Sequence, residues 1–223
     1  MPKQRKYRAI TYIDGFNLYH GIRDSEWRNC LWLDLQALSR HLLAPNNKLV
    51  AVKYFTARIR GAEDGDNRAR AADREAKRKR QADYLEALQT LPLLKIYEGH
   101  YLPKIVTCNR CGTSWLKPEE KKTDVQMATQ LVIDAYEDHF DTAMIVSGDG
   151  DITPPIEELT KRFPQKRFIA AFPPRRGNAN IAKLTHTCFM IRLDQLRSCQ
   201  LPNPVVKPDG HELWRPERWG RQP

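Results

Sequence analysis

The sequence contains no apolar stretch that approaches the roughly 20 residues needed to cross a bilayer. Its basic N-terminus leads straight into a strand-like segment, without the apolar core and cleavage site of a secretory signal. It has only five cysteines, an odd number with one close pair, which does not fit the disulfide framework of a secreted domain. We therefore expect a cytoplasmic protein that has no membrane partner.

Negative charge is scarce relative to positive charge. The chain has 27 Asp and Glu against 37 Lys and Arg, which gives a net charge of +10 and a pI near 9.5. Such a surplus suits a polyanionic partner, most commonly a nucleic acid. Part of it lies in residues 68–80, which are either a solvated helix face or an arm that follows phosphates.

Strand-like and helix-like segments alternate along the 223 residues. The expected strands are 7–14, 48–59, 93–102, 142–147, 166–173 and 189–193, and the longer expected helices are 63–91, 119–139 and 152–163. This alternation predicts a three-layer α/β domain over residues 1–198, with a central, mainly parallel sheet. We expect an irregular insert at about 103–117 and a Pro- and Trp-rich tail over 199–223.

Aspartates follow two of the expected strands. Asp14 ends the first strand, and Asp149 and Asp151 come directly after the buried run 143–146. Asp124 lies in the first turns of the helix that leads into that run. Because ligands bind at the carboxyl ends of parallel strands, we expect these carboxylates to gather at one edge of the sheet. The alternative for Asp151 is a helix cap before Ile152.

Carboxylates that gather in this way repel one another unless a divalent cation neutralises them. Hard oxygen ligands favour Mg²⁺ or Mn²⁺. In a basic protein, such a centre indicates hydrolysis of phosphodiester bonds, with the metal lowering the pKa of a bound water.

Three segments resemble the signatures of the NYN domain, a branch of the PIN-like nuclease superfamily. They are "YIDGFNLYHG" (12–21), "KKTDVQMATQLVIDA" (121–135) and "DTAMIVSGDGDITPPIEEL" (141–159). The resemblance spans roughly residues 7–195 and implies a Rossmann-like, PIN-type fold. It also implies a metal-dependent ribonuclease acting on RNA, expected to be single-stranded. The catalytic and metal-binding residues it implies are Asp14, Asp124, Asp149 and Asp151.

Four further residues are candidates for substrate binding. The resemblance includes Asn17, which would orient the metal shell or the scissile phosphate, or would simply cap the following helix. Ser147 would donate to a phosphate or only serve the turn. Arg175 and Arg176 follow the fifth expected strand, where they would meet the substrate backbone.

Two other functions stay open. Some relatives in the family carry an oxidoreductase label for hydroxylating a pyridine-type small molecule with NADH, although this sequence has no G-x-G-x-x-G fingerprint. The chain would otherwise be an RNA-binding regulator with an inactive site.

Cys108 and Cys111 have the Cys-x-x-Cys-Gly spacing of a zinc knuckle. They supply two of the four ligands that a structural zinc site needs, and His100 is the nearest further candidate. A second copy of the chain in a homodimer would complete a four-Cys site. The other interpretations are a redox pair and a reduced surface hairpin.

Overall fold

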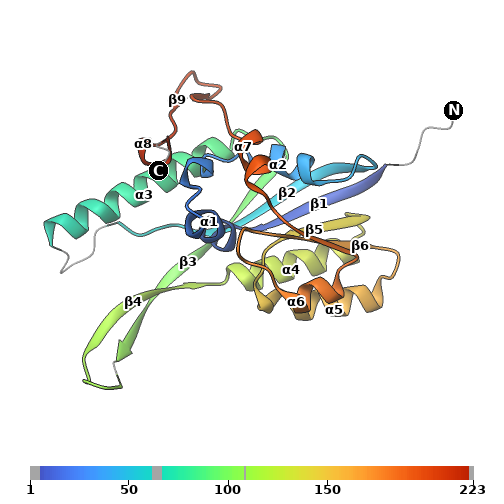
Figure 1. The fold of residues 1–223 in the computed structure, drawn as a ribbon, viewed down its shortest axis with the longest axis horizontal. Helices are drawn as coiled ribbons and strands as arrows, with labels where there is room; N and C mark the ends of the chain where they lie inside the picture. The colour runs from blue at the N-terminus through green and yellow to red at the C-terminus, as the bar shows by residue number, and fades with distance from the viewer. Residues whose placement is uncertain (1–5, 62–66, 108, 221–223) are drawn as a thin grey trace.

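Six parallel strands form the centre of the sheet in the computed structural model, which describes residues 6–61, 67–107 and 109–220. Their order across the sheet is β3 (Leu94–Thr107), β2 (Asn47–Ala57), β1 (Tyr7–Asp14), β5 (Thr142–Val146), β6 (Arg167–Phe172) and β7 (Thr187–Met190) (Figure 1). A seventh strand, β4 (Ser114–Lys121), pairs antiparallel with β3 at the edge. The structure thus confirms the predicted mainly parallel α/β fold.

The chain changes direction across the sheet once. It runs outward from β1 through β2 to β3, and the helix α4 (Thr123–Tyr136) then carries it back to β5 on the other side of β1. From β5 it continues outward through β6 to β7. The switch point therefore lies between the carboxyl ends of β1 and β5, where open α/β sheets bind their ligands.

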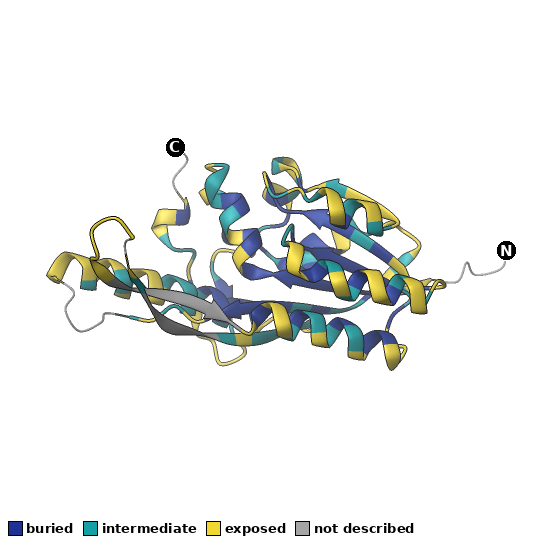
Figure 2. Ribbon diagram, turned by 90° about the horizontal axis from the view of Figure 1, so that it is seen from below, coloured by how far each residue is buried: buried dark blue, intermediate teal, exposed yellow. Residues whose placement is uncertain are grey.

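Helices cover both faces of the sheet (Figures 1 and 2). The helices α1 (Gly15–Asp24), α2 (Leu35–Leu42) and α3 (Arg68–Leu88) contribute to one apolar cluster, together with Ile13 and Val146. The helices α4, α5 (Thr153–Arg162) and α6 (Ala179–Leu184) contribute to the other, together with Tyr12 and Ile145. Successive residues of β1 and β5 face opposite clusters, so both faces fix the register of these strands.

The segment expected to be an irregular insert is a β-hairpin. The strands β3 and β4 pair from Thr107 opposite Ser114 to His100 opposite Lys121. The following helix begins at Thr123 rather than near 119, after Lys122 takes a left-handed conformation with φ 79°. Residues 119–121 have helix-forming side chains, but their backbone pairing with β3 outweighs that weak preference.

The C-terminal segment adds α7 (Leu193–Ser198), a small β8–β9 hairpin (Val205–Val206 with Glu212–Leu213) and α8 (Glu217–Gly220). Trp219 of α8 is buried against the rings of Trp32 and Tyr84, whereas Trp214 is 57% exposed. The C-terminal segment thus contributes to the apolar core around α3. Among the described residues, no helix has both the length and the apolar character that a membrane crossing requires.

Candidate functional site

The ends of β1 and β5 are joined by a buried hydrogen bond between Ser147 and Asp14. The two strands are neighbours in register, with Ile13 opposite Val146. The Ser147 hydroxyl donates to Oδ2 of Asp14 at 2.9 Å, and Oδ1 of Asp14 accepts from the backbone N–H of Asn17 at 2.9 Å. Asp14 is 8% exposed and Ser147 is 1% exposed. Asp14 therefore caps α1 and fixes the β5 end at the same time.

The loop after β5 is held by side chains at both of its ends. Oδ1 of Asn17 accepts from the backbone N–H of Gly148 at 3.1 Å, and the Ser147 hydroxyl accepts from that of Asp149 at 3.0 Å. Oδ1 of Asp149 accepts from the N–H of Asp151 at 3.0 Å and caps the short helix η2 (Gly150–Ile152). The cap is therefore Asp149, and Asp151 is left with its carboxylate exposed.

Gly148 is required by its close approach to the loop that follows β6. A Cβ atom at this position would lie 1.7 Å from the carbonyl oxygen of Arg176. Asn178 caps α6 through Oδ1, and its Nδ2 donates to the carbonyl oxygen of Gly148 at 3.1 Å. The two loops thus pack together at the switch point, and no side chain larger than hydrogen fits between them.

Both candidate arginines of this second loop contact the end of α1. Arg175 donates to the carbonyl oxygen of Asp24 at 2.8 Å, and Arg176 forms an ion pair with the Asp24 carboxylate at 2.5 Å. Hydrogen bonds from Arg23 and Arg176 lower the pKa of Asp24. The arginines lie at the carboxyl edge of the sheet, and their predicted contact with a substrate stays a prediction.

Asp124, Asp149 and Asp151 are close enough to repel one another. Partial burial, followed by the charges of Asp149 and Asp151, raises the pKa of Asp124. In the part of the chain that the structure describes, no Lys or Arg forms an ion pair with any of the three. The negative charge gathered at this edge is therefore not neutralised by a described cationic side chain.

These carboxylates do not form a closed metal cage. Within residues 6–61, 67–107 and 109–220, no three His, Cys, Asp or Glu side chains are arranged to hold one ion. Mg²⁺ keeps several waters and is commonly bound through one or two carboxylates, so one or two of Asp124, Asp149 and Asp151 fit such an ion; Asp124 and Asp151 are exposed and Asp149 is half-buried. Asp14 has both oxygens in hydrogen bonds, and its observed role is to hold the neighbouring loop in position.

A buried ion pair beneath the site went unpredicted. Asp134 of α4 is buried and contacts the Lys53 amine at 2.6 Å, the Tyr12 hydroxyl at 2.6 Å and the His139 ring at 3.0 Å. This network ties α4, which carries Asp124, to β1 and β2. The available signal is Lys53, a cation flanked by Val52 and Tyr54 in the middle of β2.

The zinc prediction cannot be placed, because Cys108 and the side chain of His100 lie outside the described residues. Cys111 is exposed in the turn between β3 and β4, and its sulfur contacts the Thr113 hydroxyl at 3.3 Å. A structural zinc at Cys108 and Cys111 stays a prediction.

The mainly parallel sheet lies between two layers of helices and has carboxylates at its switch point. This arrangement defines a Rossmann-like α/β protein of the PIN type. The model of the NYN domain matches residues 8–188, so the chain belongs to the NYN domain family. This confirms the resemblance seen in the three sequence signatures.

Two of the individual proteins that resemble this chain come from bacteria of known name. A Pseudomonas putida protein named 6-hydroxy-3-succinoylpyridine 3-monooxygenase HspA is 30% identical, over 97% of this chain and 76% of its own length. A crystal structure of a protein of unknown function from Vibrio parahaemolyticus covers 90% of this chain and 100% of its own, with a TM-score of 0.52 and 17% identity. The latter likeness supports the fold alone.

Proposed function

We propose that this protein is a Mg²⁺- or Mn²⁺-dependent ribonuclease that hydrolyses RNA phosphodiester bonds at the carboxyl edge of β1 and β5. The observation that carries the proposal is the group of three carboxylates at the switch point, none of which has a described cationic partner. Partial burial, and then the charges of Asp149 and Asp151, raise the pKa of Asp124 within this group. The net charge of +10 on the whole chain supports a polyanionic substrate.

Some residues of the site would bind the ion, and others would keep the surrounding loop in position. One or two of the carboxylates of Asp124, Asp149 and Asp151 would bind the cation, with water in its other positions. The buried Asp14, Asn17 and Ser147 would keep their loop in position. The cation, when bound, supplies a water of lowered pKa and a Lewis acid for the phosphoryl oxygen. Arg175 and Arg176 would contact the phosphates on either side, once the RNA displaces their contacts with Asp24.

Incubation of end-labelled single-stranded RNA with the full chain tests the proposal. We expect cleavage in Mg²⁺ or Mn²⁺, none in EDTA, and recovery when the metal is added back. Asp124→Asn and Asp149→Asn should lower the rate at least about 100-fold, the size of effect that loss of one strong electrostatic contact has in other enzymes. Asp209→Asn, an exposed aspartate on the β8–β9 turn, is the matched control and should cleave like the wild type.

Cleavage that persists in EDTA or in both variants would contradict the metal-dependent site. RNA binding without cleavage in either metal, unchanged by Asp149→Asn, would favour an inactive RNA-binding regulator.

A second candidate function is favoured by one observation, the similarity to the protein named as a monooxygenase over 97% of this chain. On this alternative the chain would hydroxylate a pyridine-type small molecule with NADH as reductant. The absorbance spectrum of the purified protein and an NADH-oxidation assay separate the two candidates. A bound flavin, or NADH loss that depends on the small molecule, would support the monooxygenase.

A further inference from the structure

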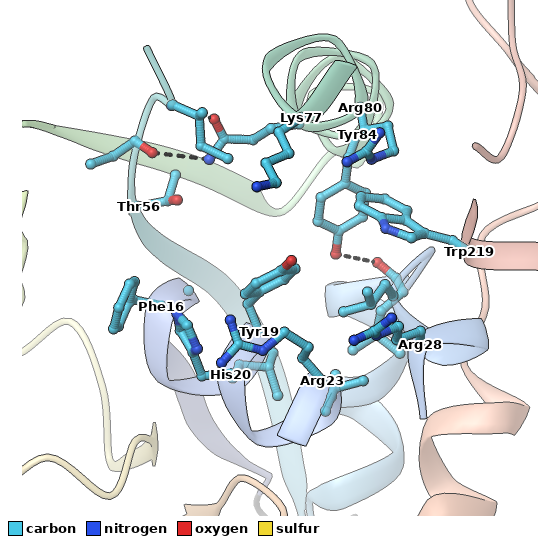
Figure 3. A pocket seen from close by; sticks show the side chains of 18 of the residues that line it. Phe16, Tyr19, His20, Arg23, Arg28, Thr56, Lys77, Arg80, Tyr84 and Trp219 are labelled. Carbon is cyan, nitrogen blue, oxygen red and sulfur yellow. Dashed lines mark hydrogen bonds between the residues drawn. The ribbon is translucent and has the colours of Figure 1, made fainter. Parts of the chain in front are cut away.

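A pocket of about 430 Å³ lies between α1 and α3 (Figure 3). Gly15 and Phe16, which directly follow Asp14, form part of its wall, and Thr56 and Ala57 belong to the carboxyl end of β2. Its volume is within the range of pockets that bind small molecules. The pocket therefore opens at the same edge of the sheet as the carboxylates, on the β2 side of α1.

Aromatic rings form much of the wall of this pocket. Tyr54 and Tyr84 contribute from β2 and α3, Tyr19 contributes from α1, and Trp219 closes the pocket from α8. The Tyr84 hydroxyl donates to the carbonyl oxygen of Leu33 at 2.8 Å, and its ring meets Trp219 edge-on at 5.7 Å. These contacts fix the rings of the inner wall. Such rings offer stacking surfaces for a flat ligand.

All charged side chains that line the pocket are positive. Of the described residues in the wall, five are Arg or Lys and none is Asp or Glu. Lys77 and Arg218 share Asp73 as an ion-pair partner, and Arg23 pairs with Asp24. The other two are Arg28 and Arg80, and neither forms an ion pair with a carboxylate in the described part of the chain.

His20 also lines this positively charged pocket. Burial lowers the pKa of this pocket-lining imidazole, and the nearby charge of Arg23 lowers it further. The ring is therefore neutral at pH 7, and the Asp24 carboxylate does not reverse this. A neutral imidazole can donate or accept a hydrogen bond at the pocket wall.

We propose that this pocket binds a flat aromatic ring that carries a negatively charged group, with the ring stacked on Tyr19 and the charge held by Arg28 and Arg80. This chemistry has two sources, the base and phosphate of a nucleotide, or a small aromatic carboxylate. The site is separate from the carboxylates of the proposed ribonuclease and requires no metal. A ring bound in this pocket would lie close to Gly15, the residue that follows Asp14.

Calorimetric titration of the full chain in EDTA tests this site. Three probes carry both a ring and a negative charge: uridine monophosphate and adenosine monophosphate as nucleotides, and benzoate as an aromatic carboxylate. Two further probes carry only one of these features: the nucleoside uridine has only the ring, and inorganic phosphate has only the charge. We expect at least one ring-plus-charge probe to bind at least about tenfold tighter than uridine and phosphate, a factor worth about 1.4 kcal/mol. Tight binding of the nucleotides or of benzoate identifies the source, and failure of all three overturns the proposal.

Two substitutions locate the binding, each with a matched control. Arg80→Gln should weaken the best probe about tenfold, about 1.4 kcal/mol, whereas Arg70→Gln on the same helix lies outside the pocket and should leave it unchanged. Tyr19→Leu, at a residue 41% exposed, should also weaken binding, whereas Tyr7→Leu, 39% exposed at the opposite end of β1, should not. Wild-type affinity in both pocket variants would overturn the proposal.

Binding of the probes to Asp149→Asn keeps this test distinct from the proposed function. If RNA is not cleaved while the probes bind in EDTA and to Asp149→Asn, the pocket stands and the ribonuclease proposal fails. If binding requires metal or is lost in Asp149→Asn, the probes occupy the carboxylate site and the pocket proposal fails.

Discussion

Asp149→Asn should stabilise the metal-free protein, although most substitutions destabilise. The Asn side chain keeps the oxygen that accepts from the Asp151 N–H, and Asn is as good a helix cap as Asp. What changes is the charge of residue 149, which in the wild type adds to the effect of partial burial in raising the pKa of Asp124. Because exposed like charges interact weakly through water, we expect a gain of about 0.5 kcal/mol, or about 1–2 °C in melting temperature.

The pH dependence of this gain follows from the direction of the pKa shift. The pKa of Asp124 is raised in the folded state, so stability falls as the pH rises through that pKa and the carboxylate ionises. The advantage of Asp149→Asn should therefore be present at pH 7 and disappear below about pH 3, where carboxyl groups are protonated. Added salt at 1 M, with a Debye length of about 3 Å, should also reduce it.

A divalent cation should reverse the order of the two proteins. Mn²⁺ at about 100 times its dissociation constant stabilises the native state by roughly 2.7 kcal/mol, which is about 5–10 °C for a chain of this size. Asp149→Asn should lose most of this increase because it has lost one ligand. Differential scanning calorimetry with Mn²⁺ or EDTA measures all four conditions.

Asp34→Asn is the matched control for this experiment. Asp34 also caps a helix, with Oδ1 accepting from the Ala37 N–H at 2.7 Å, but it lies outside the carboxylate group. It should show neither the gain in EDTA nor the loss of the Mn²⁺ response. A metal-free Asp149→Asn less stable than the wild type, with an equal Mn²⁺ response in both proteins, would refute the reasoning.

Three further predictions concern the framework of the site. Ser147→Ala leaves a buried Asp14 oxygen and the partly buried N–H of Asp149 without the hydroxyl, and should cost about 1–3 kcal/mol in urea unfolding. Gly148→Ala should displace the loop and abolish RNA cleavage, whereas Gly150→Ala, whose Cβ would lie 3.7 Å from its nearest neighbour, should be tolerated in both assays. Burial would raise the pKa of Asp134, but its hydrogen bonds outweigh burial and lower that pKa. The ionised Asp134 should therefore stabilise the fold above about pH 4, and this contribution should be lost as the pH falls further. Asp134→Asn should reduce the decrease in the free energy of unfolding at acid pH, measured by unfolding at a series of pH values.

The parts of the site that could be predicted from sequence are those fixed by local pattern. Apolar runs located β1 and β5, and the polar residues after each run had to lie at the carboxyl edge of a parallel sheet. The sequence pattern therefore places Asp14, Ser147 and Asp149 at one edge of the sheet, where the structure joins them by hydrogen bonds. The roles within this group were less accessible, because the choice between capping and ligand binding depends on side-chain geometry.

The remaining features depend on contacts between segments far apart in the chain. The β3–β4 hairpin is stabilised by backbone pairing, which the sequence of residues 119–121 does not predict because these residues favour a helix. Tyr84 and Trp219 meet only because α8 folds back onto α3, and neither residue lies in a recognisable motif. The pair of Lys53 and Asp134 likewise joins a strand to a helix that follows much later. No local periodicity contains this information.

A crystal of the full chain grown with Mn²⁺ tests most directly whether the carboxylates at the switch point hold a divalent cation. Anomalous scattering locates Mn²⁺ independently of any assumed ligand. The expected result is a peak at oxygen-ligand distance, about 2.0–2.4 Å, from the carboxylates of Asp124 and Asp149, with water in the remaining positions. A well-ordered edge without a peak, or a peak that contacts neither aspartate, would contradict the proposed metal site.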